Sequence, residues 1–252
     1  MSAQPQLPES VNLIHFASVE STNDTAKQLA ANGAKSGTLV WADEQTRGRG
    51  RGGHDWHSPP GNLYTTIILR PGKPAQETAG LSFIAALAIG DAVQEHLPHN
   101  ATLSLKWPND VLINGKKVAG ILLESAAFGG GDAEWVIVGC GVNVANYPET
   151  QGNGATSLAN EGCDNVDIGR LLEAYIQHLL DWEEQWQVSG FSPIRTAWLQ
   201  RATGIGKRVR VRLSADEFEG LFTDMDTSGA LLVELPDGHV RRVTAGDVFL
   251  CE

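Results

Sequence analysis

The chain has 252 residues, of which 42% are hydrophobic and 19% are charged, and its 30 acidic against 19 basic side chains give a formal net charge of −11. This composition excludes a disordered chain and predicts one large globular domain, or one large and one small. Because the acidic surface repels nucleic acid on average, any anion site must depend on local positive charge, and binding to an extended duplex is not expected.

The cysteines and the N-terminus predict a soluble, cytoplasmic protein with no membrane partner. Cys140, Cys163 and Cys251 are odd in number and widely spaced, which fits neither a metal site nor a disulfide framework. Residues 1–9 lack the charged and apolar regions of a signal peptide, and no apolar run is long enough to span a membrane.

The first third of the chain predicts strands, one short helix and an unusual loop. Strand-like runs of apolar and β-branched residues lie at 11–19, 38–45 and 62–69. A helix is predicted over 25–32, with several N-cap candidates in 21–24 (STND). In the loop 47–53 (RGRGRGG), three arginines alternate with glycines, and Trp56 follows. Glycine permits close approach of the backbone to a ligand and arginine binds oxyanions, so the loop indicates anion binding.

The middle of the chain predicts a long buried helix over 79–97, followed by strands. The strand-like runs are 102–107, 110–114, 117–127 and 134–144. Asn114 and Gly115 predict a two-residue hairpin between the second and third of these runs. Residues 146–165 predict an irregular loop.

The last part of the chain predicts two helices and then a change of pattern. The helices are expected over 167–187 and 191–200. Beyond Gly204 the sequence predicts five short strands separated by turns, which is typical of a small β-barrel. We therefore expect one domain over 1–205 and a second over 206–252.

Two further segments carry lysines, and each has a purely structural alternative. In 106–110 (KWPND), a proline corner would hold Lys106 at a fixed point, although an edge-strand lysine beside a structural turn explains the motif alone equally well. In 117–122 (KVAGIL), Gly120 leaves room for a ligand on the sheet, whereas a solvated hairpin tip explains Lys117 without one. The glycines of 139–143 (GCGVN) are a weak signal of the same kind.

Taken together, these segments resemble the biotin protein ligase family. The resemblance rests on 47–56 (RGRGRGGHDW), 106–110, 117–122 and 139–143, in the family's order and spacing, and it covers about residues 12–252. Residues 21–23 resemble the family's early substrate-contacting segment. The resemblance implies an α/β (α+β) fold, with a mixed sheet flanked by helices as in class II aminoacyl-tRNA synthetases, and an SH3-like barrel from about residue 206.

The resemblance implies a reaction in two steps. The carboxylate of biotin attacks the α-phosphate of ATP, which carries Mg²⁺, to give biotinyl-5′-AMP and pyrophosphate. A lysine of the biotin carboxyl carrier domain of acetyl-CoA carboxylase, or of a related carboxylase, then attacks the mixed anhydride and releases AMP. Because the substrate carboxylate is the nucleophile, the protein must bring anions together and stabilise charge on the phosphorus oxygens.

By similarity, the catalytic residues are Lys106, Arg51 and Lys117. Lys106 is expected to bridge the α-phosphate and the biotin carboxyl group, and Trp56 to pack on the nucleotide once the loop closes. No metal-binding side chain is expected, although Asp110 is a candidate for assisting metal or amine chemistry. The resemblance assigns further substrate contacts to Ser21, Thr22, Asn23, Gln45, Arg49, Gly50, Asn109, Asp110, Gly120, Gly141 and Asn143.

Two features depart from the family pattern. Many relatives carry a basic residue where His54 stands, which puts in doubt a fourth cation over the phosphates. About eleven residues precede the first predicted strand, whereas bifunctional relatives have a winged-helix domain there, so we expect a ligase that binds no DNA. The resemblance is compatible with a homodimer.

Two other functions fit part of the pattern. A lipoate ligase uses the same adenylation chemistry, although KWPND favours biotin. A non-enzymatic RNA-binding module could use the arginine-glycine loop, and it would show RNA affinity with steep salt dependence and no pyrophosphate exchange.

Overall fold

The protein is described by a computed structural model that covers residues 5–127, 131–148 and 154–251. Seven strands, four helices and one 3-10 turn (η1) lie before residue 201. Their bounds are β1 (Asn12–Val19), α1 (Thr22–Ala31), β2 (Thr38–Gln45), η1 (Arg51–Gly53), β3 (Leu63–Leu69), α2 (Gly80–Gln94), β4 (Leu103–Lys106), β5 (Asp110–Ile113), β6 (Lys116–Ala127), β7 (Ala133–Val142), α3 (Ile168–Ser189) and α4 (Phe191–Gln200). Five more strands follow: β8 (Arg208–Arg212), β9 (Glu217–Met225), β10 (Leu231–Glu234), β11 (Val240–Val243) and β12 (Asp247–Leu250).

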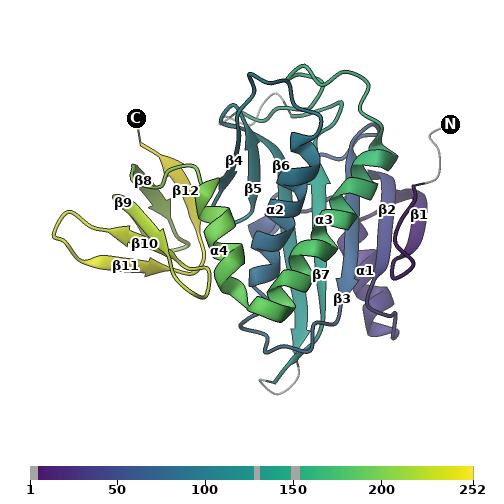
Figure 1. Cartoon of the computed structure of the whole chain (residues 1–252), viewed down its shortest axis with the longest axis horizontal. Coiled ribbons are helices and arrows are strands. Elements are labelled where there is room, and N and C mark those ends of the chain that lie inside the picture. The colour runs from purple at the N-terminus through teal and green to yellow at the C-terminus, as the bar shows by residue number, and fades with distance from the viewer. Residues whose placement is uncertain (1–4, 128–130, 149–153, 252) are drawn as a thin grey trace.

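The strands form two separate sheets (Figure 1). The seven-stranded sheet has the order β1-β2-β3-β7-β6-β5-β4, in which β1 is parallel to β2 and every other pair is antiparallel. The five-stranded sheet is antiparallel, in the order β11-β10-β9-β8-β12. A mixed sheet with helices and a small C-terminal β unit confirm the predicted fold class. The predicted boundary at residue 205 stays a prediction.

Helices cover both faces of the seven-stranded sheet. α2 and α3 pack on one face and α1 on the other (Figure 1). Successive strand residues point to opposite faces, so Leu39 and Trp41 of β2 join the larger core while Val40 packs with Ala26 under α1. α2 is apolar on nearly all sides because it lies between the sheet, α3 and α4. The α2 and α3 face therefore carries the larger core, while α1 covers the opposite face over β2, β3 and β7.

Hydrogen bonds from Trp107 and Arg195 help to attach the five-stranded sheet to the rest of the molecule. Trp107 Nε1 donates to the carbonyl of Gly229 at 3.0 Å, and Arg195 donates to the Asp224 carboxylate at 2.5 and 2.6 Å. Gly229 leaves no room for a side chain, since a Cβ there would lie 2.5 Å from Phe83. Because Trp107 directly follows Lys106, the five-stranded sheet is attached beside the lysine that the sequence singled out.

The predicted elements differ from the structure mainly at their ends. α1 begins at Thr22 and not at residue 25, because Ser21 is extended and its side chain accepts from the N–H of Asp24 as the N-cap. Asn114 and Gly115 both have positive φ, which confirms the predicted hairpin. Of the predicted loop 146–165, residues 149–153 lie outside the described residues.

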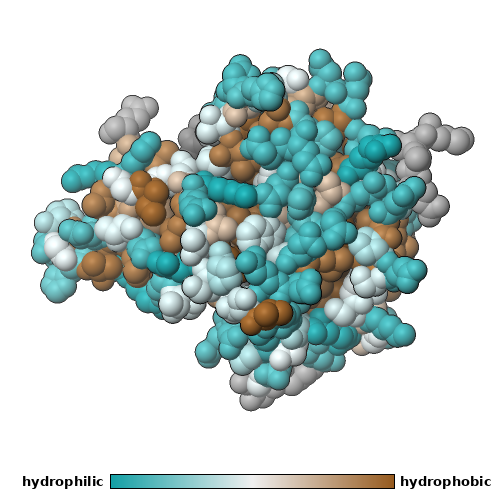
Figure 2. Space-filling view, in the orientation of Figure 1, coloured by the Kyte–Doolittle hydropathy of each residue, from teal (hydrophilic) through white to brown (hydrophobic). Residues whose placement is uncertain are grey.

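The molecular surface is mostly polar over α2 and α3, as Figure 2 shows. Apolar side chains are exposed on the five-stranded sheet, among them Leu221, Val240 and Leu250. Within the described residues, none of the helices is long and apolar enough to cross a membrane.

Candidate active site

A cavity of about 1110 Å³ lies on the seven-stranded sheet and reaches the five-stranded one. Its walls come from the start of α1, the end of β2, the arginine-glycine loop, the β4–β5 corner, and β6 and β7. Segments 212–214 and 245–248 of the five-stranded sheet complete it. The cavity brings together nearly all the residues predicted to contact substrates: Ser21, Thr22, Asn23, Gln45, Arg49, Gly50, Arg51, Trp56, Lys106, Asn109, Asp110, Lys117, Gly120 and Gly141.

Asn143 is the predicted site residue that does not line this cavity. Its Nδ2 donates to the carbonyl of Thr156 at 2.9 Å, and its own N–H donates to Val118 at 2.8 Å. It borders a small adjoining pocket that Trp56 and Lys117 also line. In this structure its side chain holds the returning chain against the end of β6.

Two paired glycines form a flat floor under Trp56. Gly120 of β6 and Gly141 of β7 lie opposite each other in the sheet. A Cβ at Gly141 would be 2.4 Å from Trp56 Nε1, and one at Gly120 would be 3.1 Å from the same ring. Lys117 Nζ lies 5.2 Å from the ring centroid, within reach of a cation–π contact. The glycines therefore provide space for a planar group on the sheet surface.

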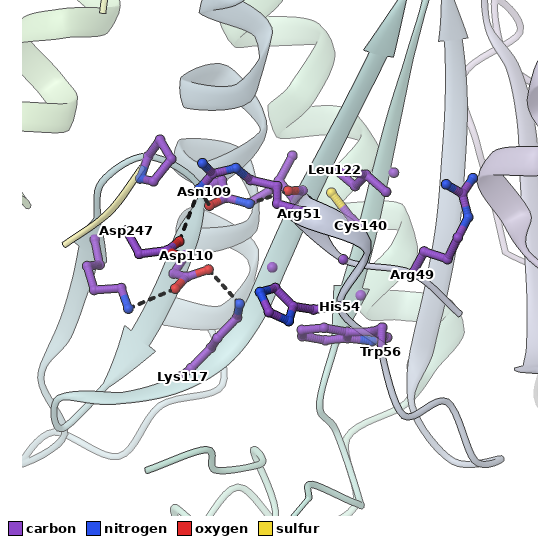
Figure 3. A pocket seen from close by; sticks show the side chains of 18 of the residues that line it. Arg49, Arg51, His54, Trp56, Asn109, Asp110, Lys117, Leu122, Cys140 and Asp247 are labelled. Atoms are coloured by element: carbon purple, nitrogen blue, oxygen red, sulfur yellow. Dashed lines mark hydrogen bonds and ion pairs between the residues drawn. The ribbon is translucent and has the colours of Figure 1, made fainter. Parts of the chain in front are cut away.

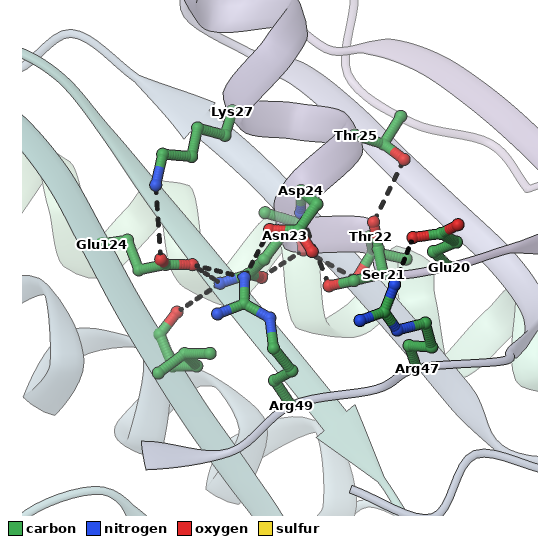
Figure 4. A network of polar contacts seen from close by, with 12 residues as sticks. Glu20, Ser21, Thr22, Asn23, Asp24, Thr25, Lys27, Arg47, Arg49 and Glu124 are labelled. Carbon is green, nitrogen blue, oxygen red and sulfur yellow. Dashed lines mark hydrogen bonds and ion pairs between the residues drawn. The ribbon is translucent and has the colours of Figure 1, made fainter. Parts of the chain in front are cut away.

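A polar network surrounds Asn23 at the other end of the floor (Figure 4). Asn23 Nδ2 donates to Glu124 at 2.9 Å and to the carbonyl of Leu122 at 3.3 Å, while its Oδ1 accepts from Thr66 Oγ1 at 2.7 Å. Every bond agrees with one orientation of the amide. A Cβ at Gly139 would lie 1.9 Å from Asn23 Oδ1, so glycine is needed there.

The Asp110 carboxylate lies between the two lysines of the site (Figure 3). Its oxygens are 3.0 Å from Lys106 Nζ and 2.6 Å from Lys117 Nζ. Burial acts to raise the pKa of Asp110, but the charge of Lys117, then that of Lys106, and hydrogen bonds to both hold this pKa below its ordinary value of 3.8. The ionised carboxylate thus gathers two cations at one wall of the cavity.

This arrangement predicts how stability depends on pH. Asp110→Asn should lower the free energy of unfolding by about 1.5–3 kcal/mol at neutral pH, the usual contribution of hydrogen bonds to charged groups. Because the folded pKa lies below the unfolded value, this stabilisation is present above pH 3.8 and is lost as pH falls through the folded pKa. Urea unfolding of both proteins between pH 7 and pH 3 tests it. A difference that persists or grows on acidification would contradict this assignment.

Two of the three arginines of the loop, Arg49 and Arg51, are fixed at separate places in the cavity. Arg49 pairs with Asp24 at the start of α1 and lies 3.6 Å from Glu124 (Figure 4). Arg51 donates to Asn109 Oδ1 at 3.2 Å and to the carbonyl of Gly246 at 3.1 Å. Arg49 therefore joins the loop to the polar network around Asn23. Arg51 joins it to the five-stranded sheet and, through Asn109, to the cavity wall that carries Lys106, Asp110 and Lys117, which we call the lysine wall.

Several lining residues carry no local sequence signal. Arg212, Gly246 and Asp247 come from turns and strand ends of the five-stranded sheet, and Asp247 lies 3.9 Å from Arg51 (Figure 3). They reach the cavity because of how that sheet is attached. Glu124 was also missed, although its place two residues after Leu122 on β6 points it to the same face.

The described residues contain no cluster of three or more His, Cys, Asp or Glu side chains that could hold a metal ion. Cys140 lines the cavity, but burial raises the pKa of its thiol to about 12, against the smaller opposing effect of its hydrogen bond with Tyr175. A neutral thiol is a poor nucleophile. The cavity lining also holds the cations Arg51, Lys106 and Lys117 and the amides of Asn23, Gln45 and Asn109.

The chain is similar to known proteins along most of its length. Residues 15–143 match the biotin/lipoate A/B protein ligase family, and residues 204–251 match the biotin protein ligase C terminal domain. The chain is 42% identical to a biotin–[acetyl-CoA-carboxylase] ligase of Paracoccus denitrificans, over 93% of this chain and 98% of that one. It is 38% identical to the bifunctional ligase/repressor BirA of Bacillus subtilis, over 95% of this chain and 74% of that one.

Solved structures give the same result. A biotin protein ligase from Aquifex aeolicus in complex with biotin and ATP has a TM-score of 0.81 and 27% identity, covering 95% of this chain and 98% of that one. A biotin protein ligase from Leishmania major in complex with biotinyl-5-AMP has a TM-score of 0.65 and 28% identity, covering 94% of this chain and 100% of that one.

Proposed function

The chain belongs to the biotin/lipoate A/B protein ligase family, and we propose that it activates biotin with ATP to biotinyl-5′-AMP and then transfers the biotinyl group to a lysine of a carrier protein. The carrier is the biotin carboxyl carrier domain of acetyl-CoA carboxylase or a related carboxylase, as the name of the Paracoccus relative suggests. The observation that carries the proposal is the single cavity that collects Lys106, Lys117 and Arg51 around a glycine floor.

The cations of this cavity suit the first step. As the biotin carboxylate attacks the α-phosphate, negative charge moves onto the phosphorus oxygens and the leaving pyrophosphate. Lys106 and Lys117 are about one third exposed, so their ammonium groups can turn from Asp110 to these oxygens. Arg51 lines the same cavity and adds a planar pair of donors. Preorganised charge of this kind stabilises a transition state more than a ground state.

The two ends of the floor suit the two substrates. The amide and hydroxyl groups of Thr22, Asn23 and Gln45 are held in fixed orientations at one end, where they can bind the polar ring of biotin. Trp56 lies at the other end and can pack on the nucleotide base. Mg²⁺ enters with ATP as part of the substrate, since phosphate oxygens are the ligands that it prefers in nucleotide sites.

Biotin-dependent exchange of labelled pyrophosphate into ATP tests this function. The exchange should require biotin, and lipoate at the same concentration should not replace it. Transfer is then tested by mass spectrometry of an apo carrier domain, which should gain one biotinyl group. Equal exchange with lipoate would favour a lipoate ligase, and binding of RNA without any exchange would contradict the enzyme altogether.

A further inference from the structure

Gln45 lines the same end of the cavity as Thr22, and both the oxygen and the nitrogen of its amide are engaged. Its Oε1 accepts from the main-chain N–H of Thr22 at 2.9 Å and from Thr22 Oγ1 at 3.1 Å. Its Nε2 donates to Ser58 Oγ at 3.0 Å. Because a main-chain N–H can only donate, the amide oxygen must face Thr22 and the amide nitrogen must face Ser58.

The orientation of Gln45 determines what the Ser58 hydroxyl does. Ser58 Oγ accepts from Gln45, so its one hydrogen is available for the main-chain carbonyl of Trp56, 2.8 Å away. Ser58 is buried, and its own carbonyl accepts from the N–H of Gln45 at 3.2 Å. The bonds thus run in one direction from Thr22 to Trp56. We call Thr22, Gln45, Ser58 and the Trp56 carbonyl the Ser58 relay.

Gly48 shows how closely the relay is packed. A Cβ at Gly48 would lie 2.5 Å from Ser58 Oγ, 2.5 Å from the Trp56 carbonyl oxygen and 3.0 Å from Gln45 Nε2. The Trp56 N–H donates to the Gly48 carbonyl at 2.9 Å. The segment that enters the arginine-glycine loop (45–48) and the segment that leaves it (56–58) therefore touch, with no space for a side chain at Gly48. The side chains of Gln45 and Ser58 connect these two segments.

We propose that Ser58 is a positioning residue that couples occupancy of the Thr22 and Gln45 end of the cavity to the placement of Trp56. The inference rests on the proposed function, in which biotin contacts Thr22 and Gln45 and the nucleotide packs on Trp56. A ligand that engages Thr22 or the Gln45 amide holds one end of the relay, and the Ser58 hydroxyl carries that constraint to the Trp56 main chain. Each substrate then tightens the binding of the other.

Calorimetry measures this coupling directly. Biotin and α,β-methylene ATP, an analogue that cannot be cleaved at the α-phosphate, are each titrated alone and with the other at saturation. In the wild-type protein, biotin should tighten binding of the analogue by roughly 5–150-fold, the usual range for coupled sites. Ser58→Ala should bring this factor close to one, while the Kd of biotin alone changes much less.

Two further variants separate the relay from general loosening of the loop. Gly48→Ala should also abolish the coupling, because its methyl group would push Ser58 away from the Trp56 carbonyl. Thr46→Ala removes an exposed hydroxyl from the same loop base, outside the relay, and should keep the wild-type factor. Equal coupling in wild type and Ser58→Ala would overturn the proposal.

Hydrogen exchange of the wild-type protein needs no variant. Biotin alone, without nucleotide, should slow exchange of the backbone amides of 55–58, because they lie at the far end of the relay. Unchanged exchange there would also overturn the role of Ser58. Absence of biotin-dependent pyrophosphate exchange in the wild type would instead overturn the proposed function, so the two failures are distinguishable.

Discussion

Lys106→Ala is expected to lower biotin-dependent pyrophosphate exchange by about 10²–10³-fold, the usual effect of removing one preorganised charge or donor from a transition state. Lys106 stands at the end of β4, where Trp107 is buried and bonded to Gly229, so the backbone that carries the ammonium group is held on both sides. Most of the loss should appear in kcat. The KM for biotin should change little, because the polar biotin end of the cavity is left intact.

Lys116→Ala is the matched control for this variant. Lys116 belongs to the neighbouring hairpin and is half exposed, and its Nζ lies 3.8 Å from Glu161, away from the residues that line the cavity. It removes one lysine charge from the same region, so it reproduces any long-range electrostatic effect. Near-normal exchange in Lys106→Ala, or an equal loss in Lys116→Ala, would contradict the assigned role of Lys106.

The motifs of this chain predicted most of the residues that line the cavity, because they are short segments whose own backbone geometry places their side chains. KWPND places Lys106 and Asp110 four residues apart across a corner, and Lys117 follows one hairpin later, so local chain geometry already brings the three charges near one another. The glycines were a weaker signal. Trp56 and Asn23 lie against them, which explains why these positions have no room for a side chain.

The remaining walls could not be predicted from local sequence. Gly246 and Asp247 contact Arg51, although Gly246 lies 195 residues after it in the sequence. Nothing in the segment around Gly246 and Asp247 indicates a ligand site. Their position depends on the attachment of the five-stranded sheet through Trp107 and Arg195, which is a property of tertiary packing. The predicted start of α1 was wrong for a different reason, which lies in the local sequence. Residues 21–24 are all suitable N-caps, and the sequence does not say which of them begins the helix.

Gly139→Ala should damage the opposite end of the cavity. The new Cβ would lie 1.9 Å from Asn23 Oδ1, so the Asn23 amide must move. That movement would break the bond that Oδ1 accepts from Thr66 and the bond that Nδ2 donates to Glu124. Inserting a methyl group into a packed site usually costs about 1–3 kcal/mol of stability. The KM for biotin should rise at least tenfold, since ~1.4 kcal/mol of lost binding gives that factor. Exchange at saturating biotin should be affected less, because the lysine wall is unchanged.

A double variant tests whether this damage acts through Asn23. Asn23→Ala removes the oxygen that the new methyl group would meet, so adding Gly139→Ala to it should cost little further stability. Urea unfolding of the two single variants and the double variant should give an interaction energy of about 0.5–3 kcal/mol, as found for residues in contact. Biotin affinity should not recover, since the Asn23 amide is absent. Additive costs would show that Gly139 is required for some reason other than space for Asn23.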